Sequence, residues 1–133
     1  MSQVIVLDTH IWFWFITQDF ARFPNSWRNK IETATQVNVS PVSCYEIALA
    51  QQRGRLELPC PATQWFKDAL EPSGISLLPL TAEIACHAVN LTAIHRDPFD
   101  RMIIATALVL EAQLASVDSL FPQYPELKDY LMT

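Results

Sequence analysis

The chain has 133 residues, half of them hydrophobic, which is enough apolar mass for one domain over residues 1–133 with a substantial core. Its longest apolar run, from Ile11 to Ile16, is far shorter than the roughly 20 residues of a membrane-spanning helix, and no segment looks like a signal peptide, so we expect a cytoplasmic protein without membrane contact. The net charge of −5, from 9 basic and 14 acidic residues, argues against the basic surface that nucleic-acid-binding proteins usually carry.

The first expected element is a buried strand. Residues 4–7 are all apolar and rich in β-branched side chains, a run typical of a strand that is buried on both faces of a parallel sheet. Asp8 and Thr9 end this run and are candidate N-terminal residues for a helix over residues 10–16. This helix is apolar on all sides, so it is expected to be buried or to contact a partner.

The next three elements alternate between helix and strand. Residues 25–34 are expected to form a helix, with Asn25 or Ser26 as its N-terminal cap. Residues 37–40 are expected to form a second buried strand. Residues 41–52 then form a helix that begins at a proline and stops shortly before a glycine.

Prolines mark the boundaries in the centre of the chain. A helix that carries Trp65 and Phe66 is bracketed by prolines on both sides. Residues 75–80 are expected to form the third strand. Thr81 is a plausible N-terminal cap for the apolar-rich helix that follows.

The C-terminal third contains the clearest helix. After a turn at Asp97-Pro98, residues 99–113 carry apolar side chains at near-helical spacing, and residues 114–117 are expected to form the last strand. Strands and helices therefore alternate along the whole chain, without an internal repeat or a low-complexity linker. This order predicts an α/β fold with a mainly parallel sheet and right-handed crossovers.

Four acidic residues at the edges of apolar segments are the main candidates for function: Asp8, Glu46, Asp100 and Asp118. Ligands of a parallel sheet gather at the carboxyl ends of its strands, where Asp8 and Asp118 are expected, while Asp100 and Glu46 lie early in helices that can face the same edge. Clustered carboxylates repel one another and need a counter-ion, and oxygen ligands suit Mg²⁺ or Mn²⁺. Such ions activate water and stabilise charge at a phosphodiester bond, so the pattern predicts a metal-dependent nuclease.

Other interpretations of these acids remain open. Each acid could instead be a helix cap, a turn former or an exposed helix residue, and Asp8 could be the nucleophile of an aspartate-dependent phosphatase. Against the phosphatase, His10 stands where dehalogenase-like phosphatases carry a second aspartate. The sequence also lacks the glycine-rich phosphate loop, the dinucleotide fingerprint, the serine nucleophile elbow and the His-Glu-x-x-His zinc motif.

The segment before the last helix holds two further candidates. His95 could contact a substrate phosphate, or it could hold Asp97 or Asp100 in place. Asp97 precedes a proline, which favours a turn, and it competes with Asp100 as the nearer metal ligand. We favour Asp100 because it leads the helix whose apolar face follows. The remaining histidines, His10 and His87, are expected to be structural.

Four stretches form a pattern that spans nearly the whole chain. They are Leu7-Asp8-Thr9-His10, then Val42-Ser43-Cys44-Tyr45-Glu46-Ile47-Ala48 followed by Gly54-Arg55-Leu56, then His95-Arg96-Asp97-Pro98-Phe99-Asp100-Arg101-Met102-Ile103-Ile104-Ala105, and Ser116-Val117-Asp118. The stretch that begins at His95 is the most specific. With this pattern the chain resembles the PIN-domain ribonucleases, and among them the VapC-like toxins of bacterial toxin–antitoxin modules.

The resemblance implies a three-layer α/β/α fold and endonucleolytic cleavage of RNA with carboxylate-bound Mg²⁺ or Mn²⁺. The implied catalytic and metal-binding residues are Asp8, Glu46, Asp100 and Asp118. Supporting roles are expected for Thr9, Ser116, Asp97, His95 and Arg101. Thr9 and Ser116 match hydroxyl positions that order the acidic pocket in the family, and Ser116 stands where threonine is common.

The resemblance also implies partners. Family relatives typically form homodimers and are silenced by a small antitoxin, whose C-terminal segment enters a groove near the active site. The aromatic residues 12–15 and the helix with Trp65 and Phe66 are candidates for such surfaces, with core packing as the alternative. An antitoxin arginine could pair with the acidic pocket. The alternative to the enzyme is a PIN-like module that binds RNA or protein without catalysis.

Overall fold

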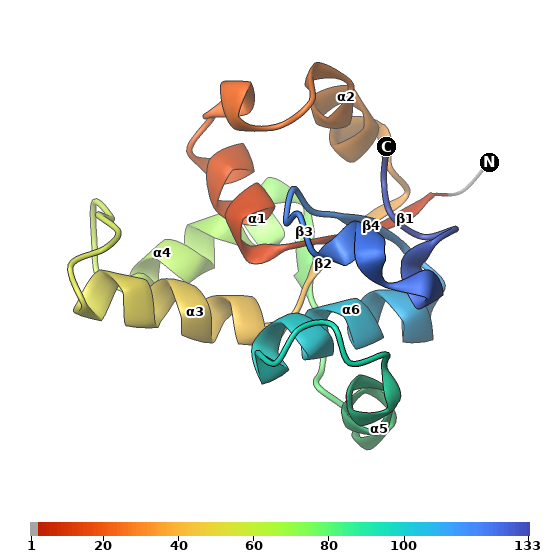
Figure 1. The fold of residues 1–133 in the computed structure, drawn as a ribbon. Coiled ribbons are helices and arrows are strands. Elements are labelled where there is room, and N and C mark those ends of the chain that lie inside the picture. Colours follow the sequence, from red (N-terminus) through yellow and green to blue (C-terminus); the bar gives the residue numbers. More distant parts are fainter. Residues whose placement is uncertain (1–2) are drawn as a thin grey trace.

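A computed structural model describes residues 3–133 and shows a sheet between helices (Figure 1). Four parallel strands form the sheet among the described residues, in the order β3-β2-β1-β4. They are β1 (Val4–Leu7), β2 (Gln36–Val39), β3 (Ile75–Leu77) and β4 (Gln113–Ala115). The α/β fold with a parallel sheet that the sequence predicts is confirmed.

The helices lie on both faces of the sheet. They are α1 (Thr9–Ile16), α2 (Asn25–Thr33), α3 (Pro41–Gln52), α4 (Ala62–Ala69), α5 (Ala82–Asn90) and α6 (Pro98–Leu110). In Figure 1, α1 and α2 lie on one side of the sheet, and α6 lies on the other with α5 beyond it. This arrangement is the expected three-layer α/β/α fold. Within residues 3–133, none of the helices is both long and apolar enough to cross a membrane.

The central strand β1 divides the core into two parts because its side chains alternate between the faces of the sheet. Ile5 and Leu7 pack with residues of α1, α2, α3 and α4. Val6 points to the other face, where it packs with α6 and with the C-terminal turns. All three side chains are fully buried. Burial on both faces explains why this strand is apolar throughout, as the sequence predicted.

The register of the sheet brings two strand ends to one place. Leu7 at the end of β1 pairs with Ala115 at the end of β4. The backbone N–H of Asp8 then donates a hydrogen bond of 2.9 Å to the carbonyl oxygen of Ala115. Residues that follow β1 and β4 therefore leave the sheet side by side, although more than a hundred positions separate them in the chain.

Several element boundaries differ from the sequence-based expectations. Helix α6 stops at Leu110, three residues early, because Glu111 adopts a left-handed conformation with φ of 54°. The last strand is correspondingly shifted to 113–115, and it ends there because its partner β1 has already turned into α1. The third strand covers only 75–77, since the next residues include Pro79, which has no N–H for the sheet. The prediction that Asn25 or Ser26 caps α2 was wrong, because Pro24 occupies the N-cap position and makes no side-chain hydrogen bond there.

The aromatic residues put forward as partner surfaces contribute largely to the core. Trp12 is fully buried and Trp65 is 6% exposed. The indole Nε1 of Trp12 donates a hydrogen bond of 3.0 Å to the carbonyl of Ala69, and its ring stacks against Phe66. For Trp12 and Trp65, the core-packing alternative is therefore correct.

Candidate metal centre

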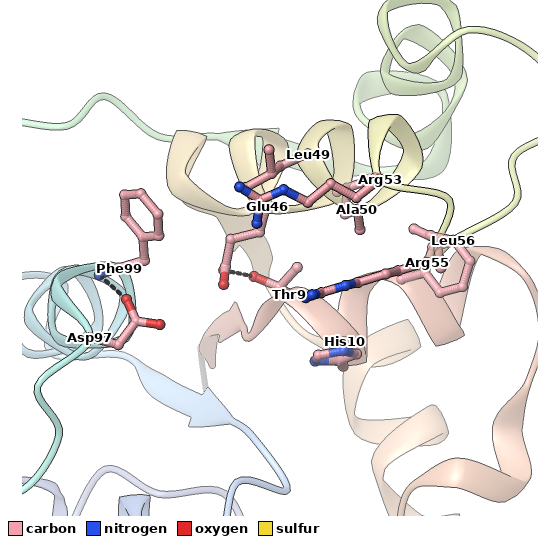
Figure 2. Close-up of a pocket in the computed structure, with 12 residues that line it drawn as sticks. Thr9, His10, Glu46, Leu49, Ala50, Arg53, Arg55, Leu56, Asp97 and Phe99 are labelled. Carbon is pink, nitrogen blue, oxygen red and sulfur yellow. Dashed lines mark hydrogen bonds between the residues drawn. The ribbon is translucent and has the colours of Figure 1, made fainter.

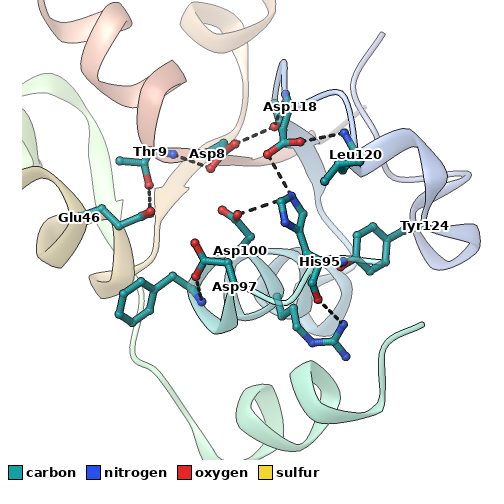
Figure 3. Close-up of polar contacts among 12 residues, drawn as sticks. Asp8, Thr9, Glu46, His95, Asp97, Asp100, Asp118, Leu120 and Tyr124 are labelled. Carbon is teal, nitrogen blue, oxygen red and sulfur yellow. Dashed lines mark hydrogen bonds and ion pairs between the residues drawn. The ribbon is translucent and has the colours of Figure 1, made fainter. Parts of the chain in front are cut away.

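The four candidate acids converge at the carboxyl edge of the sheet (Figure 3). Asp8 directly follows β1, Asp118 follows β4 by three residues, Asp100 lies in the first turn of α6, and Glu46 lies in α3. Together with neighbouring residues they line a pocket of about 230 Å³. The four acids are far apart in the chain, but they meet because the parallel strands bring these strand ends and helix starts to one edge of the sheet.

Asp8 is the most buried of the four acids, with 8% of its surface exposed. One carboxylate oxygen accepts a hydrogen bond of 2.8 Å from the backbone N–H of Thr9, as an N-cap of α1. The other accepts a bond of 2.7 Å from the hydroxyl of Ser116. Burial raises the pKa of Asp8, although both hydrogen bonds favour the charged form and oppose the shift.

Glu46 is held by a short chain of hydroxyl groups. The Thr9 hydroxyl donates a hydrogen bond of 2.6 Å to Oε1 of Glu46. Ser43 Oγ lies 2.8 Å from the Thr9 hydroxyl, and because Thr9 has given its single proton to Glu46, Ser43 is the donor in that contact. Burial raises the pKa of Glu46, with further contributions from Asp8 and Asp97 nearby.

Asp100 lies at the centre of the acidic cluster. Burial raises its pKa to about 7, and the charges of Asp8, Asp97 and Glu46 add to this shift, while His95 opposes it. Asp100 also belongs to two groups whose possible ligand atoms lie within 4.8 Å of one another. One group joins it to His95 and Asp118, and the other joins it to Glu46 and Asp97.

His95 stands between Asp100 and Asp118. Its Nε2 lies 3.2 Å from Oδ2 of Asp118 and 3.6 Å from Oδ2 of Asp100. The backbone N–H of His95 donates a hydrogen bond of 2.8 Å to the hydroxyl of Tyr124, and its ring packs edge-on against Phe121. Of the roles considered for His95, the structure supports contact with Asp100, and it adds Asp118 as a second contact.

Asp97 has the turn-forming role that its proline predicted. One oxygen accepts a hydrogen bond of 2.9 Å from the backbone N–H of Phe99, so Asp97 is the N-cap of α6. It is exposed, in contrast to the half-buried Asp100. The more central place of Asp100 agrees with the preference for it as the nearer ligand, which remains a prediction.

Arg101 points away from the acids and holds the loop that carries His95. Its guanidinium group donates to five backbone carbonyl oxygens, at distances from 2.8 to 3.3 Å. The acceptors are the carbonyls of Ala88, Val89, Leu91, Thr92 and His95. Its supporting role is therefore one of position: it joins α6 to the end of α5 and to the segment before Asp97.

Two positioning residues were not singled out by the sequence. Ser43 lies one helical turn before Glu46 on α3, a spacing that could have suggested contact with the same neighbour. Tyr124 lies in the C-terminal turns and carries no local signal, because only the folded chain brings it to His95. His10 and His87, expected to be structural, are both exposed rather than part of the core.

The donor set fits a hard divalent cation. The possible ligand atoms of the acidic cluster are carboxylate oxygens with one imidazole nitrogen, and carboxylate oxygens suit Mg²⁺ or Mn²⁺. Among residues 3–133, no lysine or arginine forms an ion pair with Asp8, Glu46, Asp100 or Asp118, and only His95 approaches two of them. Burial raises the pKa of Asp100, the neighbouring acids add to this shift, and a bound cation would relieve their repulsion.

A parallel sheet between two layers of helices, with carboxylates gathered at its carboxyl edge, defines a class of α/β/α domain with an acidic pocket. The chain belongs to the PIN domain family, whose model matches residues 5–127. It is 29% identical over 105 residues to Ribonuclease VapC22 of Mycobacterium tuberculosis, a match that covers 78% of each chain. The expected resemblance to VapC-like PIN-domain proteins is confirmed.

Solved structures agree on the fold. VapBC2 from Rickettsia felis, bound to a DNA fragment from its promoter, matches 93% of this chain and 95% of its own, with a TM-score of 0.66 and 14% identity. A toxin-antitoxin complex from Klebsiella pneumoniae matches 97% of this chain and 96% of its own, with a TM-score of 0.60 and 19% identity. At these identities the matches show a shared fold.

Proposed function

We propose that the chain is a Mg²⁺- or Mn²⁺-dependent endoribonuclease and the toxin of a toxin–antitoxin module. The observation that carries the proposal is the convergence of Asp8, Glu46, Asp100 and Asp118 without a lysine or arginine partner among the described residues. A scaffold gains no stability from gathering like charges, whereas a cation-dependent active site requires them. The similarity to a protein named ribonuclease supports RNA as the substrate.

In such a site, some residues of the pocket would bind the cation and others would orient these ligands. Asp8, Glu46, Asp100 and Asp118 would hold the cation, which when bound lowers the pKa of water and stabilises charge at the phosphate oxygens. Ser116 fixes the direction of the Asp8 carboxylate. Thr9 orients Glu46 through a hydrogen bond in the same way, and His95 does so for Asp118. No protein side chain is needed as the nucleophile.

The proposal is tested by cleavage of a mixed RNA pool with Mg²⁺, with Mn²⁺ and with EDTA, followed by sequencing of the 5′ ends. We expect metal-dependent cuts that decrease by at least about 100-fold in Asp8→Asn and in Asp100→Asn. Asp68→Asn, which changes an exposed acid on α4, serves as the matched control and should cut normally. Cuts that survive either site variant would mean a contaminating nuclease, and RNA binding without cleavage would mean a silent PIN-like module.

We further propose a homodimer and a cognate antitoxin as protein partners. Two solved structures of similar fold are described as a VapBC assembly and a toxin-antitoxin complex, which supports a partner of this kind. Light scattering on the purified chain should give twice its mass of 15.1 kDa. A monomer at micromolar concentration would contradict the dimer, and co-expression with a small neighbouring DNA-binding protein should yield a stable complex that no longer cuts RNA.

A further inference from the structure

A second and larger pocket adjoins the acidic one (Figure 2). Its volume is about 460 Å³, and it shares Thr9, His10 and Glu46 with the acidic pocket. A polymer whose phosphate lies at the carboxylates must continue past these shared residues. The larger pocket is therefore the natural place for the part of a substrate next to the reacting bond.

Two arginines give this pocket a local positive charge. Arg53 and Arg55 follow α3 and line the pocket, and Figure 2 shows both side chains reaching along it in the direction of Glu46 and Thr9. Within the described part of the chain, neither arginine forms an ion pair. In a protein with a net charge of −5, two uncompensated guanidinium groups beside an acidic centre mark a site for anions.

Two phenylalanine rings form part of the pocket lining, beside its charged side chains. Phe13 and Phe99 each pack against another aromatic ring. Phe13 packs on Trp65 at 5.8 Å between ring centroids, and Phe99 packs on Tyr45 at 5.1 Å. Supported rings of this kind present stacking surfaces for unpaired nucleobases, which single-stranded RNA exposes.

We propose that the pocket between α1, α3 and Phe99 binds a nucleotide adjacent to the scissile phosphate of a single-stranded RNA. Arg53 and Arg55 contact its phosphates, and Phe13 or Phe99 stacks on its base. This inference rests on the proposed function, because it assigns the neighbouring nucleotide of the same substrate. Charge complementarity and continuity with the acidic pocket favour a polyanion with bases over a protein segment.

The test measures RNA binding separately from cleavage. In an Asp100→Asn background, the double variant Arg53→Gln/Arg55→Gln is titrated against a short fluorescent single-stranded RNA over a range of KCl concentrations. We expect its affinity to fall by about 10-fold or more at low salt. The slope of log K against log salt should become shallower by about 1.4, since each phosphate contact of a single strand contributes about 0.7.

A stacking variant separates base contact from charge. Phe13→Leu keeps an apolar side chain against Trp65 but removes the ring. It should weaken binding by roughly 5-fold to 10-fold without changing the salt slope, because no charge is altered. An RNA strand that lacks bases near the cleavage site should likewise bind the parent more weakly, whereas equal affinity for both strands would contradict base stacking.

Arg22→Gln/Arg28→Gln is the matched control, because it removes the same charge from residues outside both pockets. If this control weakens RNA binding as much as Arg53→Gln/Arg55→Gln does, the loss of affinity comes from net charge and the inference is wrong. Unchanged affinity and slope in Arg53→Gln/Arg55→Gln would also overturn it. On the active chain we expect a higher KM with kcat retained; a chain that binds RNA through this pocket but never cuts it would overturn the proposed function alone.

Discussion

Ser116 and Thr9 act on single carboxylates of the acidic pocket. Each donates one hydrogen bond of 2.7 or 2.6 Å, to Asp8 and Glu46 respectively. Such neutral donors favour the charged form of an acid without occupying the place of a cation. Their loss should therefore weaken cation binding while the fold is retained.

For Ser116→Ala we expect the affinity for Mn²⁺ to fall by about 10-fold to 100-fold, the usual effect of losing a residue that orients a ligand. Ser116→Thr keeps the hydroxyl and should bind nearly as the parent does. Calorimetric titration with Mn²⁺ measures both. Equal affinity in the alanine variant would show that the hydroxyl does not orient Asp8.

Asp100 should destabilise the protein when no cation is bound, since burial and three neighbouring acids oppose its charge. Asp100→Asn removes that charge and keeps the shape of the side chain. At a pH well above 7 and in EDTA, we expect its Tm to exceed that of the parent by at least about 3 °C, equivalent to about 1 kcal/mol for a chain of this size. A lower Tm would mean that the carboxylate makes a stabilising contact.

The sequence predicted where the acids lie, and the resemblance pointed to the hydroxyls of Thr9 and Ser116 that contact them, but other contacts of the pocket were missed. Asp8 and Asp118 could be placed because each follows an apolar run that reads as a buried strand. The contact of His95 with Asp118 could not, since it depends on how a loop before α6 meets a turn after β4. Tyr124 was missed for the same reason, because its hydroxyl acts on a backbone atom 29 positions away.

At the scale of elements, Arg101 joins two helices. Its side chain extends from α6 and donates hydrogen bonds to carbonyl oxygens at the end of α5. The last carbonyl groups of a helix have no acceptor role within the helix, so they are free to accept these bonds. The same guanidinium holds the carbonyl of His95. Arg101 therefore helps to fix the shape of the segment between α5 and α6, together with Tyr124, whose hydroxyl accepts from the N–H of His95.

We expect Arg101→Ala to lower the free energy of unfolding by about 1.5–3 kcal/mol, the range for a hydrogen bond to a charged group. Arg101→Lys should recover only part of this loss, because an ammonium cannot reach acceptors on several sides at once. Urea denaturation measures both variants. Arg96→Ala, an exposed neighbour, should change stability little.

Element types were easier to predict than element ends. Apolar runs bounded by polar residues predicted each of the four strands and the helices between them. The end of α6 was placed too late because nothing in its apolar pattern shows that Glu111 turns left-handed. The third strand was placed too long because an apolar run continues past the point where the sheet ends.

For the whole molecule, the acidic pocket sets how stability depends on pH. The pKa values of Asp8, Glu46 and Asp100 are all raised, chiefly by burial. A group with a raised pKa binds more protons in the folded chain than in the unfolded one, so the free energy of unfolding falls as pH rises between the two values. For Asp100 that window runs from 3.8 to about 7.

We therefore expect the cation-free protein to lose stability as pH rises through this window and to level off above it. Mg²⁺ should reverse the loss by about 2.7 kcal/mol when present at roughly 100 times its Kd. Thermal unfolding across a pH series, with EDTA and with Mg²⁺, measures both effects. Stability that rises with pH in EDTA would contradict the raised pKa values.

The hydrogen bond between Ser116 and Asp8 spans 108 positions of the chain. Both residues leave neighbouring strands, so the pocket cannot close until β4 has paired with β1. During synthesis, Asp8 and Glu46 emerge from the ribosome well before Ser116 and Asp118, and Asp100 also precedes them. A chain that stops before Ser116 thus carries three of the acids but lacks the assembled centre, and the proposed activity would begin only after β4 has joined the sheet.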